Sequence, residues 1–161
     1  MTLLNPNAAA YADKVRIRVC GICLKEDRLL LVRHQGTVQN QSLWAPPGGG
    51  LQFGETVREC LVREVLEETG LETEVTRFLF VNEFKEHPLQ AVELFFELRI
   101  TGGELIKGTD PEAAADQQLI EEVAFLSLQE IRDIPLADKH RALHYLFSLD
   151  DLLGMPHHFL K

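Results

Sequence analysis

The residues of this chain best suited to chemistry lie in one short segment, 49–71, which reads GGLQFGETVRECLVREVLEETGL. Its positions follow the spacing G-x5-E-x7-R-E-U-x-E-E-x-G-U, in which U is a bulky apolar residue. The seven fixed residues are Gly49, Glu55, Arg63, Glu64, Glu67, Glu68 and Gly70. If each occurs at about 6% by composition, a chance match at one starting point has a probability on the order of 10⁻⁹. We therefore treat the pattern as a functional motif.

The glutamates of this motif predict a site for a hard cation. Oxygen ligands, with neither cysteine nor histidine at the fixed positions, favour Mg²⁺ or Mn²⁺ over zinc. Gly49 and the glycines beside it allow the main chain to approach a ligand closely and to direct a carbonyl oxygen at a metal. Arg63 could neutralise part of the negative charge, and Glu55 lies upstream to meet it. That pair leaves three further carboxylates, which a divalent cation would neutralise.

A helix over residues 56–69, ended by Gly70 as a left-handed cap, would carry these glutamates. At about 100° per residue, Glu64 and Glu68 point the same way as the apolar side chains, and Glu67 lies at the edge of that stripe. Burying unpaired carboxylates costs several kcal/mol or shifts their pKa. Glu59 lies opposite the stripe and is expected at an ordinary surface position. The phase of the other glutamates thus indicates a compensating cation.

Segment 49–71 resembles the Nudix box at every fixed position. The similarity covers about residues 15–135 and includes the preceding WAPPG and the later VAFLSLQEI. The resemblance implies an α/β fold, specifically a Nudix-type α/β/α sandwich with a mixed β-sheet. It also implies an Mg²⁺ or Mn²⁺ cofactor and hydrolysis of the pyrophosphate bond in a nucleoside diphosphate linked to a group X.

Carried over by position, the resemblance implies that Glu64, Glu67 and Glu68 are catalytic metal ligands, one of which could also handle the attacking water. The Gly49 carbonyl would be a further ligand, and a salt bridge between Glu55 and Arg63 would hold the loop to the helix. The family often supplies another acidic ligand from beyond the box. The candidates here are Glu112, Asp116, Glu121 and Glu122; we prefer Glu122, although a solvated position is open to each.

The substrate is less well defined by the sequence. Subgroups resembling ADP-ribose hydrolases carry a proline some fifteen or sixteen residues beyond the box, and here Pro88 follows Leu71 by seventeen. This favours ADP-ribose or a nucleotide sugar over a nucleoside triphosphate. A nucleotide-sensing module without catalysis is a further alternative. A base could stack on Trp44, Phe53 or Phe84, and phosphate could meet Arg33, Arg58 or Lys85, although packing and surface roles are also open to them.

Composition limits the partners. Sixteen Lys and Arg against 25 Asp and Glu leave a net charge of −9, which argues against a nucleic-acid polymer but not against a small metal-bound nucleotide. No apolar run approaches the ~20 residues that span a bilayer, so no membrane partner is expected. The three cysteines are too few for a disulfide framework, and the start of the chain lacks a secretory pattern. We expect a cytoplasmic protein, and the family resemblance makes a homodimer an open expectation.

The elements that must position the motif form one domain, 15–152, between a loose arm, 1–14, and a tail, 153–161. Cys20 and Cys23 should face opposite sides of a strand. His140 and His144 share a helix face, for which solvent is the expected surrounding. The pattern predicts an antiparallel hairpin of strands 15–24 and 28–34, and further strands over 72–84, 91–101 and 119–128. Residues 44–50 are expected to be irregular and residues 107–118 to form a loop. A short helix is predicted over 129–134 and an amphipathic helix over 137–152.

Overall fold

The computed structural model describes residues 9–35, 41–109, 120–155 and 159–160. Its main elements follow in the order β1 (Val15–Ile22), β2 (Leu24–Lys25), β3 (Arg28–Gln35), β4 (Ser42–Ala45), β5 (Gly48–Gly50), α2 (Val57–Thr69), β6 (Leu71–Glu86), β7 (Leu89–Gly103), β8 (Ile120–Ser127), α3 (Leu128–Asp133), η2 (Leu136–Asp138), η3 (Arg141–Leu143), α4 (Asp151–Gly154) and β9 (Phe159–Leu160).

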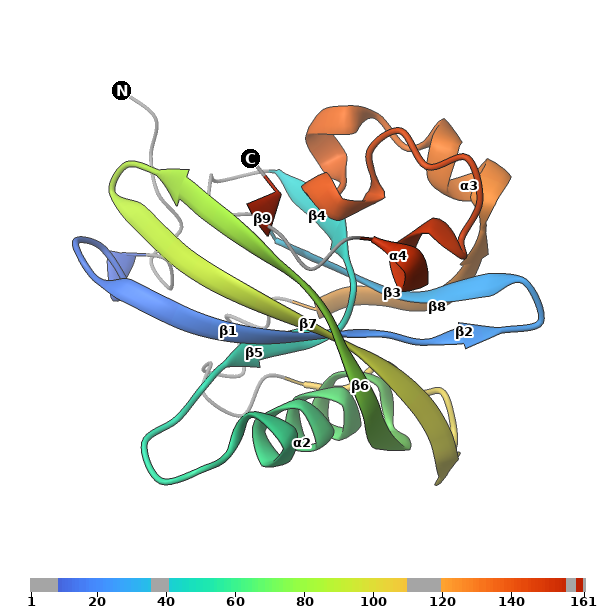
Figure 1. The fold of residues 1–161 in the computed structure, drawn as a ribbon, viewed down its shortest axis with the longest axis horizontal. Coiled ribbons are helices and arrows are strands. Elements are labelled where there is room, and N and C mark those ends of the chain that lie inside the picture. Colours follow the sequence, from blue (N-terminus) through green and yellow to red (C-terminus); the bar gives the residue numbers. More distant parts are fainter. Residues whose placement is uncertain (1–8, 36–40, 110–119, 156–158, 161) are drawn as a thin grey trace.

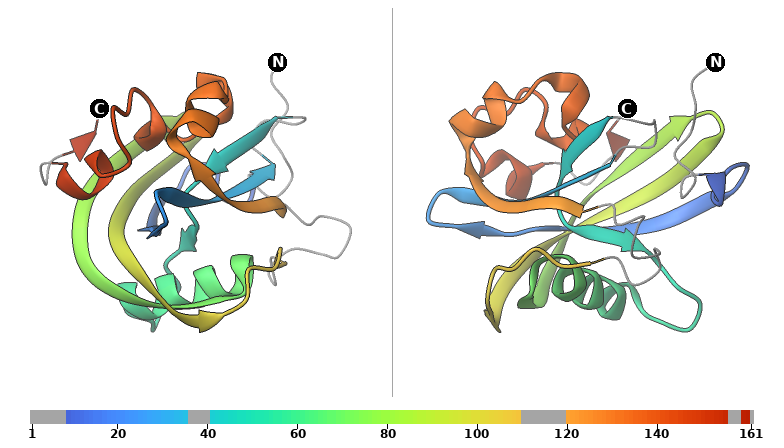
Figure 2. Two further views of the ribbon diagram at one scale, coloured as in Figure 1. Left: turned by 90° about the vertical axis from the view of Figure 1, so that its right-hand side faces the viewer. Right: turned by 180° about the vertical axis from the view of Figure 1, so that it is seen from behind.

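Two sheets lie between α2 on one side and the segment from α3 to α4 on the other (Figures 1 and 2). The first is five-stranded in the order β5-β1-β7-β6-β9, and the second joins β2, β3 and β4, with β8 also paired to β3. β1 runs parallel to β7 and β6 runs parallel to β9, while β5 pairs antiparallel with β1 and β6 pairs antiparallel with β7. The predicted α/β class with a mixed sheet is therefore confirmed.

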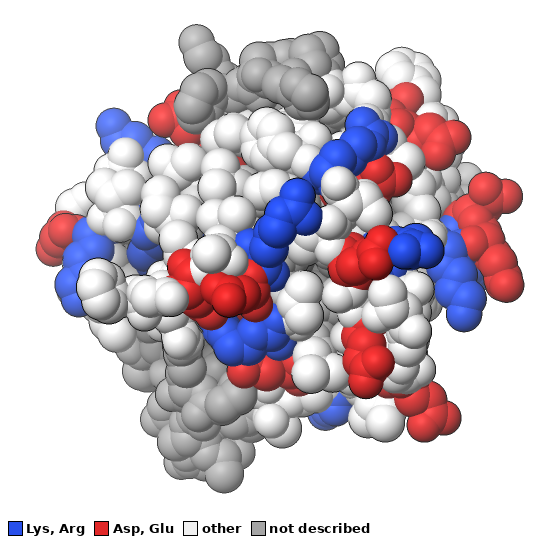
Figure 3. Space-filling model, turned by 60° about the horizontal axis from the view of Figure 1, so that its bottom comes forward, with Lys and Arg blue, Asp and Glu red and all other residues white. Residues whose placement is uncertain are grey.

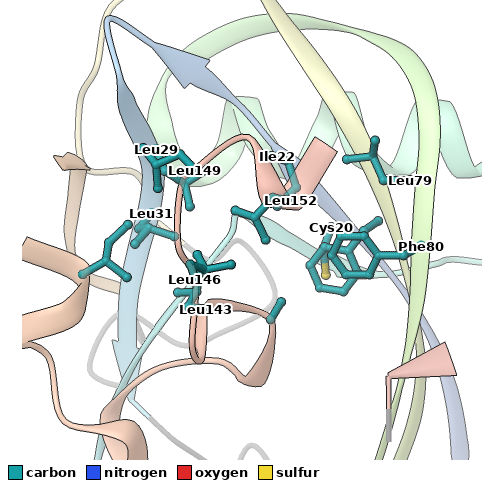
Figure 4. Close-up of a cluster of buried hydrophobic side chains, with 13 residues drawn as sticks. Cys20, Ile22, Leu29, Leu31, Leu79, Phe80, Leu143, Leu146, Leu149 and Leu152 are labelled. Carbon is teal, nitrogen blue, oxygen red and sulfur yellow. The ribbon is translucent and has the colours of Figure 1, made fainter. Parts of the chain in front are cut away.

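Alternating side chains of the strands supply two hydrophobic cores, one on each side of the sheets. Leu29 and Leu31 of β3 pack toward the C-terminal segment, whereas Leu30 between them packs toward α2. Figure 4 shows the first core, where leucines of residues 143–152 meet β1, β3 and β6. Cys20 and Cys23 are both buried and free, and they belong to opposite cores. The prediction that they face opposite sides of the strand is confirmed.

Helix α2 begins and ends at the residues that its sequence predicts. Thr56 accepts a hydrogen bond from the Glu59 N–H, while the Glu59 carboxylate accepts one from the Thr56 N–H, which is a complete capping box. Gly70 ends the helix with φ 73°, a left-handed conformation that a glycine adopts without strain. The exposed Glu59 is therefore a helix cap. These two ends fix which side chains α2 presents to the loop before it.

Two local predictions near the box are wrong. The predicted hairpin reduces to a short pairing of β2 with the start of β3, because β1 instead pairs with β5 and β7. Residues 44–50 are not wholly irregular, since they include the end of β4 and all of β5. Gly48–Gly50 lies antiparallel to Arg18–Cys20 of β1, and this pairing satisfies the glycine backbone. The box loop is thus attached to the edge of the five-stranded sheet.

The predicted amphipathic helix over 137–152 is also wrong. The segment folds as 3-10 turns η2 and η3 and the short α4. Lys139 forms a bridge to Trp44, and the His140 N–H donates to the Trp44 carbonyl at 2.7 Å, so this part of the chain pairs with β4 rather than with itself. The residues of its predicted apolar face are nevertheless buried: Ala142, Leu143, Leu146 and Leu149. The short helix predicted over 129–134 is present as α3.

Some predictions fall outside the described residues. They include Glu112, Asp116 and most of the predicted loop over 107–118. Within the ranges that the structure describes, every helix is too short or too polar to cross a membrane.

Candidate functional site

Arg63 joins the loop of segment 49–71 to helix α2. Its Nη2 donates to Oε1 of Glu55 at 2.8 Å and its Nε donates to Oε2 at 3.1 Å, a bidentate pair. These hydrogen bonds from Arg63 are the largest influence on Glu55, and they lower its pKa to about 2. Glu55 also accepts from the Gln52 N–H at 2.8 Å. The loop is therefore attached to the helix by charged, directional bonds.

The same guanidinium reaches the glutamates of α2. Its Nη1 lies 2.9 Å from Oε1 of Glu64 and 3.2 Å from Oε2 of Glu67. Burial raises the pKa of Glu64, against the lowering influence of Arg63. Only 15% of the Glu64 side chain is exposed, and the lowering influences of Arg63 and Arg18 on its pKa do not offset this burial, so its carboxylate is partly uncompensated.

Gly49 lies directly against the Glu64 carboxylate. A Cβ added at Gly49 would fall 2.3 Å from the carboxyl carbon of Glu64 and 2.4 and 2.6 Å from its two oxygens. One residue earlier, the Gly48 N–H donates to Oε2 of Glu68 at 3.1 Å. The glycine loop and two of the predicted ligands are thus in contact, whereas the approach of the Gly49 carbonyl to a metal stays a prediction.

The predicted ligands do not converge as a finished metal site. In the described part of the chain, no group of three or more Asp, Glu, His or Cys side chains is arranged to hold a metal ion. The physical reason lies in Arg63, which engages the carboxylates of both Glu64 and Glu67. The structure therefore brings Gly49, Glu64, Glu67 and the Glu55–Arg63 pair together, and turns Glu68 toward the glycine loop.

Glu122 is placed elsewhere, on β8. Its carboxylate lies 3.2 Å from Nη2 of Arg33, and the neighbouring Glu121 lies 3.2 Å from Nε of the same arginine. Glu122 is opposite Arg33 in the β3–β8 register. Among the contacts of the described residues, none joins Glu122 to the glutamates of α2.

A cavity of about 630 Å³ opens beside the box, between the five-stranded sheet and the segment around η2 and η3. Arg16 and Arg18 of β1 line it, and both adjoin the glycine loop: Arg18 is opposite Gly50 in the register, and a Cβ at Gly50 would meet Nη2 of Arg16 at 2.9 Å. Burial opposes the charge of Arg18, yet its pKa is raised overall, in part by Glu93 and the glutamates of α2. Arg18 is therefore common to the cavity and to the box.

A buried polar network lies in the floor of this cavity. Glu93 of β7 is only 5% exposed, and its Oε2 accepts from Nδ2 of Asn82 at 2.8 Å and meets Nε2 of His140 at 2.7 Å. The Ala142 N–H donates to Nδ1 of His140, so Nε2 carries the hydrogen that points at Glu93. Burial alone would raise the pKa of Glu93, but the bond from His140 and the other positive neighbours lower it to about 2.

This network was missed by the sequence reasoning, and the expectation for His140 was wrong. His140 is half-buried against Glu93 instead of lying on a solvated helix face. A signal exists in β7, where Glu93 alternates in phase with Ala91 and Phe95 and so places a charge on an apolar face.

Of the proposed ligand-binding side chains, Phe84 and Lys85 line the cavity, whereas Phe53 is fully exposed and Arg58 bonds to the Val75 carbonyl.

The surface around α2 carries charges of both signs. Figure 3 shows this face, at the bottom of Figure 1, with acidic and basic side chains interspersed, and neither sign covers it. A nucleic-acid polymer is usually bound by a continuous basic stripe. No such stripe is visible among the described residues on the face shown in Figure 3.

Comparison with known proteins identifies a matching family model and several relatives. The model of the NUDIX domain matches residues 14–149. The chain is 35% identical over 100 residues to an ADP-ribose pyrophosphatase of Methanocaldococcus jannaschii, an alignment that covers 61% of this chain and 59% of that protein. It is 32% identical over 134 residues to a MutT-like protein of Streptomyces ambofaciens, with 83% and 82% covered.

Solved structures agree on the fold. A UDP-X diphosphatase superposes with a TM-score of 0.67 at 22% sequence identity, covering 91% of this chain and 68% of the other. At that identity the similarity concerns the fold alone. The chain spans less than two thirds of the length of the relative from Methanocaldococcus jannaschii, so the similarity alone does not assign the activity of that whole protein to this chain.

Proposed function

Because the chain belongs to the NUDIX family, we propose that it is a metal-dependent pyrophosphohydrolase, which cleaves the pyrophosphate bond of a nucleoside diphosphate linked to a group X. The observation that carries this proposal is the contact of Gly49 with the largely buried carboxylate of Glu64, inside a loop that the Glu55–Arg63 pair attaches to α2. A purely structural helix does not need a largely buried glutamate against a glycine backbone.

The residues at this site fit a divalent metal by their chemistry. Glu64, Glu67 and Glu68 offer hard oxygen atoms, which Mg²⁺ and Mn²⁺ prefer, and the Gly49 carbonyl would add another. Glu64 and Glu67 would exchange Arg63 for the metal, and Glu122 would join them only by leaving Arg33. When bound, such a metal neutralises charge on phosphoryl oxygens and lowers the pKa of a coordinated water.

The protein residues would then act mainly by positioning and electrostatics. Arg63 holds the loop in place through Glu55 and keeps the carboxylates of α2 close together. Glu64, whose burial favours the protonated form, could accept a proton from the attacking water. The cavity beside the box, with Arg18 at its boundary, would take the nucleoside part of the substrate.

Two further candidates concern the substrate and the reaction. ADP-ribose or a nucleotide sugar is favoured by the ADP-ribose pyrophosphatase among the relatives and by a cavity large enough for a nucleoside. A nucleoside triphosphate is the alternative substrate. A nucleotide-sensing module without turnover is the alternative function, but every fixed position of the box is present in this chain.

We also infer the setting of this activity from the sequence. Residues 15–152 would form the hydrolase domain, between an arm at 1–14 and a tail at 153–161. The small number of cysteines favours the cytoplasm, and the family resemblance leaves a homodimer as an expectation.

The experiment that tests the function uses a panel of nucleoside diphosphate derivatives with Mg²⁺ or Mn²⁺ and replaces the box glutamates one at a time. Glu64→Gln and Glu68→Gln should each lower kcat at least a hundredfold, and Glu26→Gln, at an exposed turn, is the matched control. Undiminished turnover in both box variants would overturn the mechanism. Tight binding of a nucleotide without product from any substrate would favour the sensing module.

A further inference from the structure

A row of residues crosses the cavity floor from the box toward the far side of the five-stranded sheet. Gly50 of β5 is opposite Arg18 of β1, Arg18 is opposite Glu93 of β7, and Glu93 is opposite Asn82 of β6. Residues in one register row project to the same face of a sheet, so these three side chains share the cavity. At roughly 4.8 Å between strands, the row extends roughly 14 Å from the glycine loop.

Two polar atoms in this row are buried without a hydrogen-bond partner among the described residues, and a third, in Glu93, has only a long ion-pair contact. Oδ1 of Asn82 and Nε of Arg18 are both buried and unpaired. Oε1 of Glu93 is 3.9 Å from that Arg18 Nε, too long for a hydrogen bond, while its Oε2 takes both bonds of the network. From β1 to β6, the row therefore offers the cavity one donor, Nε of Arg18, and then two acceptors, Oε1 of Glu93 and Oδ1 of Asn82.

The orientation of these groups is determined by their neighbours. Asn82 directs its amide nitrogen at Glu93, because its oxygen would be repelled by the ionised carboxylate, and this leaves Oδ1 as the unpaired atom. His140 directs its Nε2–H at Glu93 and therefore does not donate a hydrogen bond to Oδ1 of Asn82. The unpaired Oδ1 of Asn82 is thus a consequence of the network and not a free choice of rotamer.

The polar row is flanked by an apolar row on one side and by a row that contains an arginine on the other. The next row on the same face contains Cys20, Phe95 and Phe80, whose two rings stack at 4.5 Å. The row on the other side contains Arg16, Ala91 and Phe84. The aromatic rings beside the stripe offer apolar contacts to a flat ring with one hydrogen-bonding edge, and the Glu93 carboxylate in the stripe repels phosphate. Arg16 and Arg18 lie at the β1 end of their rows, next to the glycine loop, where the phosphates of the same ligand would extend.

We propose that Arg18, Glu93 and Asn82 form a base-reading subsite that selects nucleobases carrying an exocyclic amino group. A guanine edge offers an acceptor and two N–H donors in the order of the row, and an adenine edge offers a ring nitrogen beside an amino group with two N–H donors. Uracil and hypoxanthine lack the amino group and would leave a buried acceptor unpaired. This assignment rests on the proposed function, since it places the phosphates of the same ligand toward the box.

A structural role alone does not account for the row. The contact of Glu93 with His140 attaches the segment around η3 to the sheet, and this explains the position of His140. That contact provides no hydrogen-bond partner for Oδ1 of Asn82 or Nε of Arg18, although a buried unsatisfied polar atom destabilises a fold. A ligand edge supplies the partners that the fold does not.

The direct test measures binding to the unmodified protein by titration calorimetry, without metal. Guanosine 5′-monophosphate is compared with inosine 5′-monophosphate, and adenosine 5′-monophosphate with purine riboside 5′-monophosphate, because each pair differs only in the amino group. We expect the amino-bearing member of at least one pair to bind tenfold or more tightly. The pair that shows the preference identifies the base. Equal affinities within both pairs, or no binding of any of the four, would overturn the assignment.

A variant pair separates recognition from folding. Asn82→Leu should reduce the preference within the selected pair to less than twofold. Thr73→Val is the matched control, since it also removes a buried unpaired oxygen from β6 but lies outside the cavity lining, and it should keep the preference. A preference that survives Asn82→Leu in a folded protein, as judged by circular dichroism, would overturn the role of Asn82.

The outcome is distinguishable from a failure of the proposed function. Metal-dependent hydrolysis of nucleoside diphosphate derivatives without any base preference would overturn the subsite and leave the function intact. A clear amino preference in binding, with no hydrolysis of any derivative, would support the subsite and overturn the catalytic function.

Discussion

Replacing Gly49 by alanine should disrupt the proposed site while leaving the fold largely intact. The added Cβ would lie 2.3 Å from the carboxyl carbon of Glu64, whereas ordinary contacts begin near 3.4 Å, so one partner must move by about 1 Å. The backbone of Gly49 is fixed by pairing with Val19 of β1, and the displacement therefore falls on the carboxylate. A shift of this size in a catalytic group costs roughly a hundredfold in kcat/KM.

The effect on stability should be much smaller. Glu64 is a side chain with free rotation at its end, so overpacking it costs about 1 kcal/mol of unfolding free energy, near the low end for an inserted methyl group. For a chain of 161 residues this lowers the melting temperature by about 2–4 °C. A hundredfold loss of kcat/KM corresponds to about 2.7 kcal/mol of activation free energy, so the expected effect on activity is between two and three times the expected effect on stability.

The assay follows hydrolysis of nucleoside diphosphate derivatives with Mg²⁺, together with thermal unfolding monitored by circular dichroism. Gly154→Ala is the matched control, because a Cβ there meets nothing within 4 Å, and it should retain full activity. Wild-type kcat/KM in Gly49→Ala would refute the reasoning that Gly49 is required for the position of Glu64.

Further expectations follow from the other contacts. Arg63→Lys should lower kcat/KM about tenfold with little loss of fold, because an ammonium group cannot form both bonds to Glu55; an unchanged rate would contradict the loop attachment. Mg²⁺ at a hundred times its Kd should raise the unfolding free energy by about 2.7 kcal/mol, and Glu64→Gln should greatly reduce that gain in a thermal-shift assay. Thr56→Ala should cost about 1 kcal/mol in chemical denaturation through loss of the helix cap. Glu93, whose folded pKa of about 2 is below its usual 4.5, stabilises the fold above pH 4.5 and loses that contribution as the pH falls toward 2, so Glu93→Gln should unfold with a shallower pH dependence in this range.

The box was predictable because its information is local. The spacing of the glutamates sets their phase on α2, Thr56 and Gly70 set the ends of the helix, and Arg63 can reach Glu55 across one loop. The contact of Gly49 with Glu64 follows from that loop and the first turns of the helix. The metal-binding role itself stays a prediction, since Arg63 engages Glu64 and Glu67 in this structure.

The cavity was not predictable, because its residues are assembled from distant strands. Glu93 meets Asn82 only through the pairing of β6 with β7, and it meets His140 only because the later segment folds over the sheet. That segment has the spacing of an amphipathic helix, but pairing of Lys139 and His140 with Trp44 overrides the local preference. The leucines reach the core by separate turns, so their burial was correct although their secondary structure was not.

The central claim is that the glutamates of α2 support hydrolysis of a pyrophosphate bond. It is tested most directly by incubating the protein with nucleoside diphosphate derivatives in ¹⁸O-labelled water, with Mg²⁺ or with a chelator, and identifying the products by mass spectrometry. We predict two phosphate-bearing products, one of which contains a single ¹⁸O, only when metal is present, and a loss of both in Glu64→Gln and Glu68→Gln. Metal-independent products, or full turnover in both variants, would contradict it.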